Sequence, residues 1–121
     1  MKFVLITQDP EMVQAAKAGF QPNDETLVFE DWATALGHCE GADLMFVDLI
    51  ATLDEPHKIA GYEKFAEAKM ASEEAAAVPV VLIAAPDGYE LDFMSGFPNF
   101  VFAHLRRPVS EKIFRRASTW V

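Results

Sequence analysis

The chain has 121 residues, of which 51% are hydrophobic and 24% are charged, and its net charge is -9 at pH 7. This length fits one compact domain, 1–121, and the composition excludes an intrinsically disordered chain. The excess of acid disfavours nucleic-acid binding, because it repels a phosphate backbone. No apolar run approaches the roughly 20 residues of a membrane-spanning helix, and none resembles a signal peptide. We therefore expect a cytoplasmic protein that does not bind membranes.

The basic residues are concentrated near the end of the chain. Half of the ten lysines and arginines lie within 106–121, namely Arg106, Arg107, Lys112, Arg115 and Arg116. A short basic face of this kind predicts an acidic protein partner. Cys39 is the only cysteine, so the chain can form no intrachain disulfide, and a cysteine-based zinc site is not expected.

Five short apolar runs predict the strands of a buried parallel sheet. These runs are 3–6, 26–29, 44–49, 80–83 and 100–105. Capping residues and helical spacing predict helices from Asp9 to Gly19, from Asp31 through Cys39 to Gly41, over 62–77, over 89–95, and after Ser110. Residues 50–58 are predicted to form a loop. This alternation indicates an α/β fold, with a parallel sheet between two layers of helices.

In a parallel sheet, ligands bind beyond the carboxyl ends of the strands, so the residues at these ends are the candidate site. They are Thr7, Gln8, Asp48, Ala84, Ala85, Arg107 and Pro108. Asp48 is the only ionisable residue in its apolar strand, and a buried carboxylate is costly unless it is paired. Arg107 is the predicted partner. The alternative is that Asp48 sits at the strand edge and caps loop amides.

Several segments, taken in order, resemble the receiver domain of two-component response regulators over nearly the whole chain. They are Ala35-Leu36, the run from Asp43 to Leu49, Gly61-Tyr62-Glu63, Pro79-Val80-Val81 and Arg107-Pro108. The resemblance implies a flavodoxin-like (βα)5 three-layer sandwich, whose five-stranded parallel sheet has the order 2-1-3-4-5. It also places the phosphoacceptor position of the family on Asp48.

The chain departs from this family at the residues that would bind metal. Phosphorylated receivers hold Mg²⁺ with two adjacent acids after the first strand, and these positions fall on Thr7 and Gln8. Asp9 matches a third acid that some members carry. We therefore expect no metal and no other cofactor; the remaining candidate ligands are Asp9 and Asp48.

The switch residues of the family are also altered. The switch Thr or Ser falls on Ala84, which has no hydroxyl to bond a phosphoryl oxygen, and the switch aromatic falls on His104. The lysine of the family falls on Arg107, which keeps the positive charge but changes its geometry. An Arg107–Asp48 ion pair is expected to hold one conformation.

Three functions are compatible with these residues, to different degrees. The first is a pseudo-receiver: a phosphorylation-independent protein-interaction module in signal transduction, without enzymatic activity. The second is a working receiver that is phosphorylated on Asp48 and uses Mg²⁺. The third is a flavodoxin-like cofactor enzyme, which is disfavoured because no glycine-rich phosphate-binding loop follows any strand.

The resemblance implies protein partners, either a histidine kinase or an output protein. In the family the usual partner face combines the fourth helix, the fifth strand and the last helix, and a homodimer through this face is an alternative. Here that face would include Tyr89, Leu91, Phe93, Met94, Phe97, Phe100 and the basic C-terminal helix. Aromatic, Met and Arg side chains are enriched in interface cores.

Overall fold

The computed structural model describes residues 1–54, 60–84 and 101–120. In this part of the chain five strands form one parallel sheet in the order β2-β1-β3-β4-β5. The strands are β1 (Lys2–Ile6), β2 (Glu25–Phe29), β3 (Leu44–Asp48), β4 (Val80–Ala84) and β5 (Val101–Arg106). This confirms the predicted flavodoxin-like architecture and its 2-1-3-4-5 strand order. The predicted helix over 89–95 and the candidate residue Ala85 lie outside the described residues.

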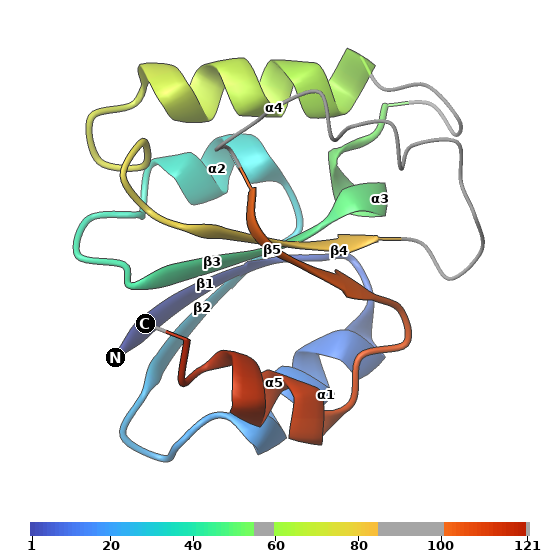
Figure 1. Ribbon diagram of the computed structural model, residues 1–121. Coiled ribbons are helices and arrows are strands. Elements are labelled where there is room, and N and C mark those ends of the chain that lie inside the picture. The colour runs from blue at the N-terminus through green and yellow to red at the C-terminus, as the bar shows by residue number, and fades with distance from the viewer. Residues whose placement is uncertain (55–59, 85–100, 121) are drawn as a thin grey trace.

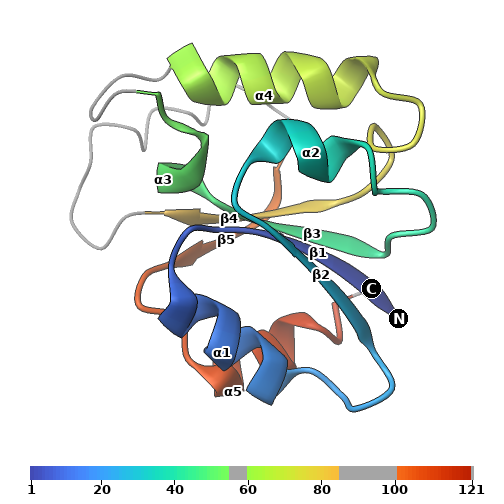
Figure 2. The same ribbon diagram turned by 180° about the vertical axis from the view of Figure 1, so that it is seen from behind.

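Helices cover both faces of the sheet and complete the three layers (Figure 1). On one face lie α1 (Pro10–Gly19) and α5 (Glu111–Ala117). On the other lie α2 (Trp32–Leu36), α3 (Leu49–Thr52) and α4 (Ala60–Ala71), as the view from behind also shows (Figure 2). Within the described residues, none of these helices is long and apolar enough to cross a bilayer.

Three helices begin at the capping residues that the sequence predicts. The side chain of Asp9 accepts a hydrogen bond from the backbone N–H of Glu11, and Asp31 accepts one from Thr34. Ser110 accepts one from Ile113 at the start of α5. These bonds satisfy amides that a helix leaves without an internal partner at its first turn.

The length predicted for the helix from Asp31 to Gly41 is wrong. It ends at Leu36, because the N–H of Gly37 bonds to the carbonyl of Thr34 and thereby tightens the last turn. Cys39 therefore lies outside α2, although it is buried and its thiol donates to the carbonyl of Ala35. Gly41 has φ of 76° and turns the chain toward β3.

Two further boundaries differ from the prediction. Part of the predicted loop over 50–58 forms the short helix α3, which Asp48 caps through the N–H of Ile50. The helix predicted over 62–77 runs instead from Ala60 to Ala71. It ends early because Ser72 accepts a hydrogen bond from the N–H of Ala75 and turns the chain out of the helix. Gly61 lies so close to α3 that a Cβ there would be 2.3 Å from the carbonyl oxygen of Thr52.

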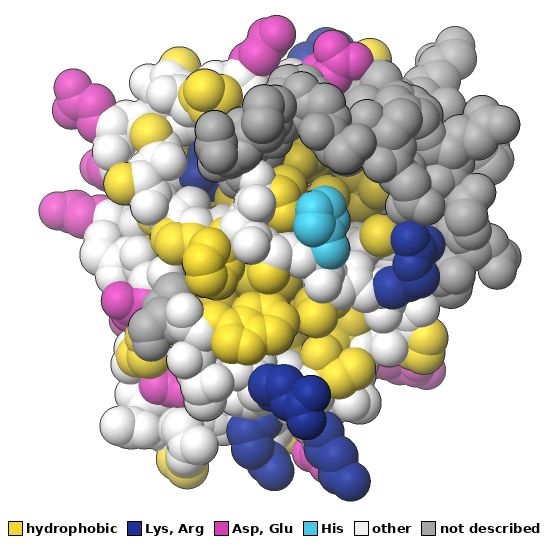
Figure 3. All heavy atoms as spheres, viewed as in Figure 1, with side chains coloured by type: hydrophobic (Ala, Val, Ile, Leu, Met, Phe, Trp, Pro, Cys, Tyr) yellow, Lys and Arg dark blue, Asp and Glu magenta, His cyan; other side chains and the backbone are white. Residues whose placement is uncertain are grey.

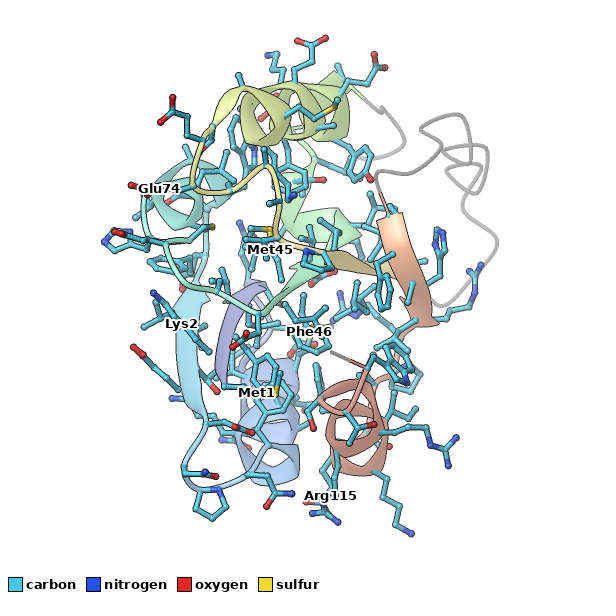
Figure 4. The ribbon with its side chains drawn as sticks, turned by 60° about the vertical axis from the view of Figure 1, so that its left-hand side comes forward. Met1, Lys2, Met45, Phe46, Glu74 and Arg115 are labelled. Atoms are coloured by element: carbon cyan, nitrogen blue, oxygen red, sulfur yellow. The ribbon has the colours of Figure 1, made fainter. Side chains whose placement is uncertain are left out.

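The core has two parts, one on each face of the sheet. Met45 and Phe46 are successive residues of β3, and their side chains point to opposite faces (Figure 4). Met45 packs with the cluster under α2 and α4, which includes Tyr62 and Phe65. Phe46 packs with the cluster under α1 and α5, which includes Phe114. Because both faces are covered, every residue of β3 is buried.

This arrangement brings together the carboxyl ends of strands that are distant in the sequence. β3 lies between β1 and β4, and β5 pairs with β4, so β1, β3, β4 and β5 all end at the edge of the sheet near α3 (Figure 1). Candidate site residues follow these strand ends, as the sequence predicts.

Candidate functional site

The centre of the site is Asp48, the last residue of β3. Its residue surface is only 2% exposed, and both carboxylate oxygens accept hydrogen bonds. Oδ2 accepts from the Thr7 hydroxyl at 2.8 Å, and Oδ1 accepts from the backbone N–H of Ile50 at 3.3 Å. The carboxylate is thus held in place by one bond from the end of β1 and one from the first turn of α3.

Arg107 links Asp48 to a second acid. Its Nη1 donates to Oδ2 of Asp48 at 3.4 Å, and its Nη2 forms an ion pair with Oδ2 of Asp9. The base of the side chain is fixed, because the N–H of Arg107 bonds to the carbonyl of Ala84 at 3.0 Å. One guanidinium therefore bridges two carboxylates that come from different elements.

The sequence left an ion pair and the capping of loop amides as alternatives for Asp48; the ion pair occurs, and the capped amide belongs to a helix. Asp48 pairs with Arg107 through Oδ2 and caps α3 through Oδ1. Asp9 likewise caps α1 through Oδ1 and contacts Arg107 through Oδ2. A carboxylate has enough lone pairs for both tasks.

Sequence reasoning missed the contribution of Thr7, which it treated only as the replacement of an acid. Thr7 is buried; its hydroxyl donates to Asp48 and accepts the N–H of Asp9 at 3.1 Å. Its own N–H bonds to the carbonyl of Phe29. A hydroxyl that follows a buried strand and lies near an acid at the same sheet edge was the available clue.

Burial dominates the electrostatics of Asp48. Removal from water raises the pKa of this carboxyl, while the Thr7 hydroxyl and the Arg107 guanidinium act in the opposite direction. The net direction is upward, so the site favours the protonated form of Asp48 more than water does.

The side chains of the other predicted site residues, Ala84, Gln8 and His104, do not hydrogen-bond to Asp48. Ala84 ends β4 and presents only a methyl group, although its carbonyl holds Arg107. Gln8 is exposed, and its amide donates to the carbonyl of Glu30 at 3.4 Å, away from Asp48. His104 is exposed on β5 and takes part in none of the hydrogen bonds that join Thr7, Asp9, Asp48 and Arg107.

A pocket of about 590 Å³ adjoins the network between α1 and the residues that follow β5. It is lined by Asp9, Glu11, Met12, Ala15, Ile50, Arg107, Pro108 and Val109. Most of these residues are apolar, while the acids and Arg107 provide the polar part of the wall.

The residues present do not fit the magnesium site that the resemblance implies. Mg²⁺ prefers six oxygen ligands in near-octahedral geometry, usually including carboxylates with free lone pairs. Here the carboxylates of Asp9 and Asp48 are bridged by Arg107. No group of three or more His, Cys, Asp or Glu residues suited to a metal ion occurs among the residues that the structure describes.

No protein-family model matches the sequence, and no curated protein has a significantly similar sequence. Solved structures do share the fold. A bacteriophytochrome response regulator, RtBRR, matches with a TM-score of 0.70 and 21% identity over 97% of this chain and 75% of its own. A signal receiver domain of a histidine kinase from Clostridium thermocellum matches with a TM-score of 0.74 and 14% identity over 97% and 93%.

The chemotaxis response regulator CheY4 of Vibrio cholerae is similar to the same extent. It matches with a TM-score of 0.71 and 14% identity, over 97% of this chain and 94% of its own. The chain therefore has the fold of response-regulator receiver domains over almost its whole length.

Proposed function

We propose that this protein is a pseudo-receiver, a signalling module that binds protein partners without being phosphorylated. The observation that carries the proposal is the Arg107 guanidinium, which bridges Asp48 and Asp9 in the pocket where a receiver would hold a metal ion. The receiver fold supports a place in two-component signalling, and we expect a cytoplasmic location.

The surroundings of Asp48 disfavour phosphoryl transfer. Both of its oxygens already accept hydrogen bonds, and Oδ2 also pairs with Arg107, so attack on a phosphorus atom would require these contacts to be given up. Phosphoryl transfer needs cations to neutralise the charge that develops in the transition state. With Thr7 and Gln8 after β1, the two acids that the family carries there are missing, and Asp9 is the acid that Arg107 joins to Asp48. Ala84 has no hydroxyl to donate a hydrogen bond to a phosphoryl oxygen.

The face of β5 and α5 is the proposed partner surface. β5 is an edge strand, Phe102 on it is 56% exposed, and Ile113 on α5 is 38% exposed. Figure 3 shows apolar side chains gathered over these elements with lysines and arginines beside them. The basic side chains of α5 are Lys112, Arg115 and Arg116, all exposed. An apolar surface rimmed by positive charge suits an acidic partner.

A kinase or output protein is favoured over a second copy as this partner. In a two-fold symmetric dimer the same patch meets itself, which would bring the basic side chains of both α5 helices together. Like charges brought together across an interface oppose association. The homodimer remains the alternative arrangement.

A working receiver phosphorylated on Asp48 is the second candidate. It is supported by the position of Asp48 at the carboxyl end of β3 and by Asp9, a second carboxylate that contacts the same guanidinium. This candidate requires Arg107 to move away so that the two acids can receive Mg²⁺.

Phosphodonor labelling distinguishes the two candidates. The protein is incubated with acetyl phosphate and Mg²⁺, and its intact mass is measured alongside an Asp48→Ala variant. We expect no phosphate adduct on either protein. An adduct on the wild type that is absent from Asp48→Ala would overturn the pseudo-receiver and establish the working receiver.

A further inference from the structure

The acidic pocket already contains a positive charge. The side chain of Asp48 is 3% exposed and that of Asp9 is 28% exposed, and Arg107, at 21% exposed, contacts both. An exposed ion pair contributes little to stability, but a buried carboxylate needs a counter-charge or a proton. The Arg107 guanidinium, together with the Thr7 hydroxyl that donates to the same oxygen, therefore favours the ionised form of Asp48 against the effect of burial.

The fork of the guanidinium suits this double contact. Nη1 reaches Asp48 and Nη2 reaches Asp9, so the two acids are served by different nitrogens of one planar group. An ammonium group carries its donors on a single nitrogen at the end of a flexible chain and lacks this fixed geometry. The backbone bond from Arg107 to Ala84 holds the arginine at the position from which both acids are in reach.

The oxygens that a metal ion would need are already engaged. Oδ2 of Asp48 accepts from Thr7 and from Arg107, and Oδ1 accepts from the N–H of Ile50. The hydroxyl of Thr7 accepts the N–H of Asp9. A divalent cation would have to break several of these bonds and would lie close to a guanidinium of like sign.

We propose that Arg107 is a built-in replacement for the divalent cation: its single positive charge is shared by Asp9 and Asp48, and its contacts with both acids oppose the binding of Mg²⁺ between them. The pocket is then complete without a metal, in a state that does not depend on the supply of Mg²⁺ or of a phosphodonor. This inference rests on the proposed function for the identity of the pocket, but its test measures metal binding instead of phosphorylation.

The test is a titration with Mn²⁺, a paramagnetic substitute for Mg²⁺ that broadens the NMR signals of nearby amides. The proteins are the wild type, Arg107→Gln, and Arg106→Gln as a control that removes the same charge from the neighbouring position. In Arg107→Gln we expect broadening centred on the amides of Asp9 and Asp48 at a Mn²⁺ concentration that leaves the other two proteins unaffected. It should occur at a Mn²⁺ concentration about tenfold or more below any that affects these amides in the other two proteins, since a 1.4 kcal/mol loss of repulsion suffices for that factor.

Broadening of the Asp9 and Asp48 amides in the wild type at the same Mn²⁺ concentration as in Arg107→Gln would overturn the proposal. The absence of such broadening in a folded Arg107→Gln would overturn it too. If Arg107→Gln does not fold, Asp9→Asn is compared with the wild type by the NMR signal of the Arg107 side-chain Nε–H. We expect slow exchange with water in the wild type and at least tenfold faster exchange in the variant; equal rates would contradict the bridge.

The two proposals can fail separately. If Mn²⁺ binds between Asp9 and Asp48 in a wild-type protein that takes no phosphate, the proposal that Arg107 replaces the cation is overturned, but the pseudo-receiver proposal is not. A phosphate adduct on wild-type Asp48 would remove the pseudo-receiver, whatever the Mn²⁺ titration shows.

Discussion

A single hydroxyl group connects the first and third strands at the site. Thr7 donates to Asp48 and accepts from the N–H of Asp9, so it links the carboxylate to the start of α1. Because Thr7 and Asp48 are both buried, water cannot replace this hydrogen bond if it is lost.

Thr7→Val tests the contribution of this hydroxyl with little change in shape. We expect the free energy of unfolding to fall by about 1–3 kcal/mol, because the substitution leaves a buried carboxylate oxygen with one donor fewer. Urea denaturation at pH 7 measures it. The control is Thr7→Ser, which keeps the hydroxyl, and equal stability of the Val and Ser variants would contradict the role of the hydrogen bond.

Another buried polar side chain lies on α4. Lys69 is 2% exposed, and its ammonium donates to the carbonyl of Ala76 at 3.3 Å. Burial lowers the pKa of Lys69, and the nearby Cys39 acts against this shift. The folded protein thus holds the Lys69 proton less firmly than the unfolded chain does.

The sign of the pH effect follows from that difference. Between the lowered pKa of the folded state and the ordinary value of 10.5, the unfolded chain binds more protons, so stability rises with pH through this range. We expect the free energy of unfolding of the wild type to rise with pH relative to that of Lys69→Met, which cannot titrate there. Denaturation of both proteins from pH 7 to 10 measures it; a constant difference between them would contradict the lowered pKa.

At the residue scale, the sequence predicted the Asp48–Arg107 pair because both residues follow strands of one parallel sheet and have opposite charges. It did not predict the link from Arg107 to Asp9, because the role of Asp9 as a helix cap already accounted for an acid at that position. The buried position of Lys69 was hidden as well: good helix formers on both sides of it fit a solvated helix equally well. The metal-free character of the pocket stays a prediction.

At the scale of elements, α1 and α5 approach each other closely at one glycine. A Cβ on Gly19 would lie 2.4 Å from the carbonyl oxygen of Glu111 and 3.0 Å from the Cβ of Phe114. Both distances are shorter than ordinary contacts, and the first involves backbone that cannot rotate away. The absence of a side chain at Gly19 thus allows the two helices to pack side by side (Figure 2).

Gly19→Ala is expected to destabilise the protein by about 1–3 kcal/mol, since α5 must shift to relieve the overlap. The matched control is Gly37→Ala, where a new Cβ would lie at an ordinary distance of 3.5 Å from the Thr34 carbonyl oxygen. At Gly37, whose backbone is helical, alanine is expected to stabilise by about 0.4–1 kcal/mol. Thermal or urea denaturation measures both; a neutral Gly19→Ala would contradict the close packing.

Helix starts were predicted better than helix ends, and the reason is local chemistry. A start is marked by a cap such as Asp9, Asp31 or Ser110, whose partner lies two or three residues away. The end of α4 depends instead on Ser72, which turns the chain where the alanine-rich sequence favours a longer helix. Propensity alone cannot show that a serine side chain bonds to the N–H of Ala75.

At the scale of the whole molecule, charge is segregated between an acidic body and a basic C-terminal helix. Net charge is -9, yet α5 presents Lys112, Arg115 and Arg116 on an exposed surface. Arg115 lies at the outer end of the lower layer of helices (Figure 4). An acidic, partly apolar partner would approach this end by long-range attraction and be repelled by the rest of the molecule.

A synthetic peptide of alternating Glu and Leu provides a probe for this face. We expect it to shift the NMR signals of Phe102 and Ile113, and to bind about tenfold more weakly to Arg116→Gln or at high salt, because attraction between exposed charges is screened. Lys64→Gln on α4 is the charge-matched control and should bind as the wild type does. Shifts centred on α4, or affinity unchanged in Arg116→Gln, would place the partner surface elsewhere.

The bridge from Arg107 to Asp9 also has a consequence for synthesis of the chain. It joins residues that are 98 positions apart, and its second contact, to Asp48, spans 59 positions. Both acids leave the ribosome long before the arginine, so β1 and β3 can pair at a time when their shared pocket still has no counter-charge. The two acids gain their shared cationic partner only when the last strand has been made, and the final part of the polypeptide thereby completes a network whose other side chains come from the first half of the chain.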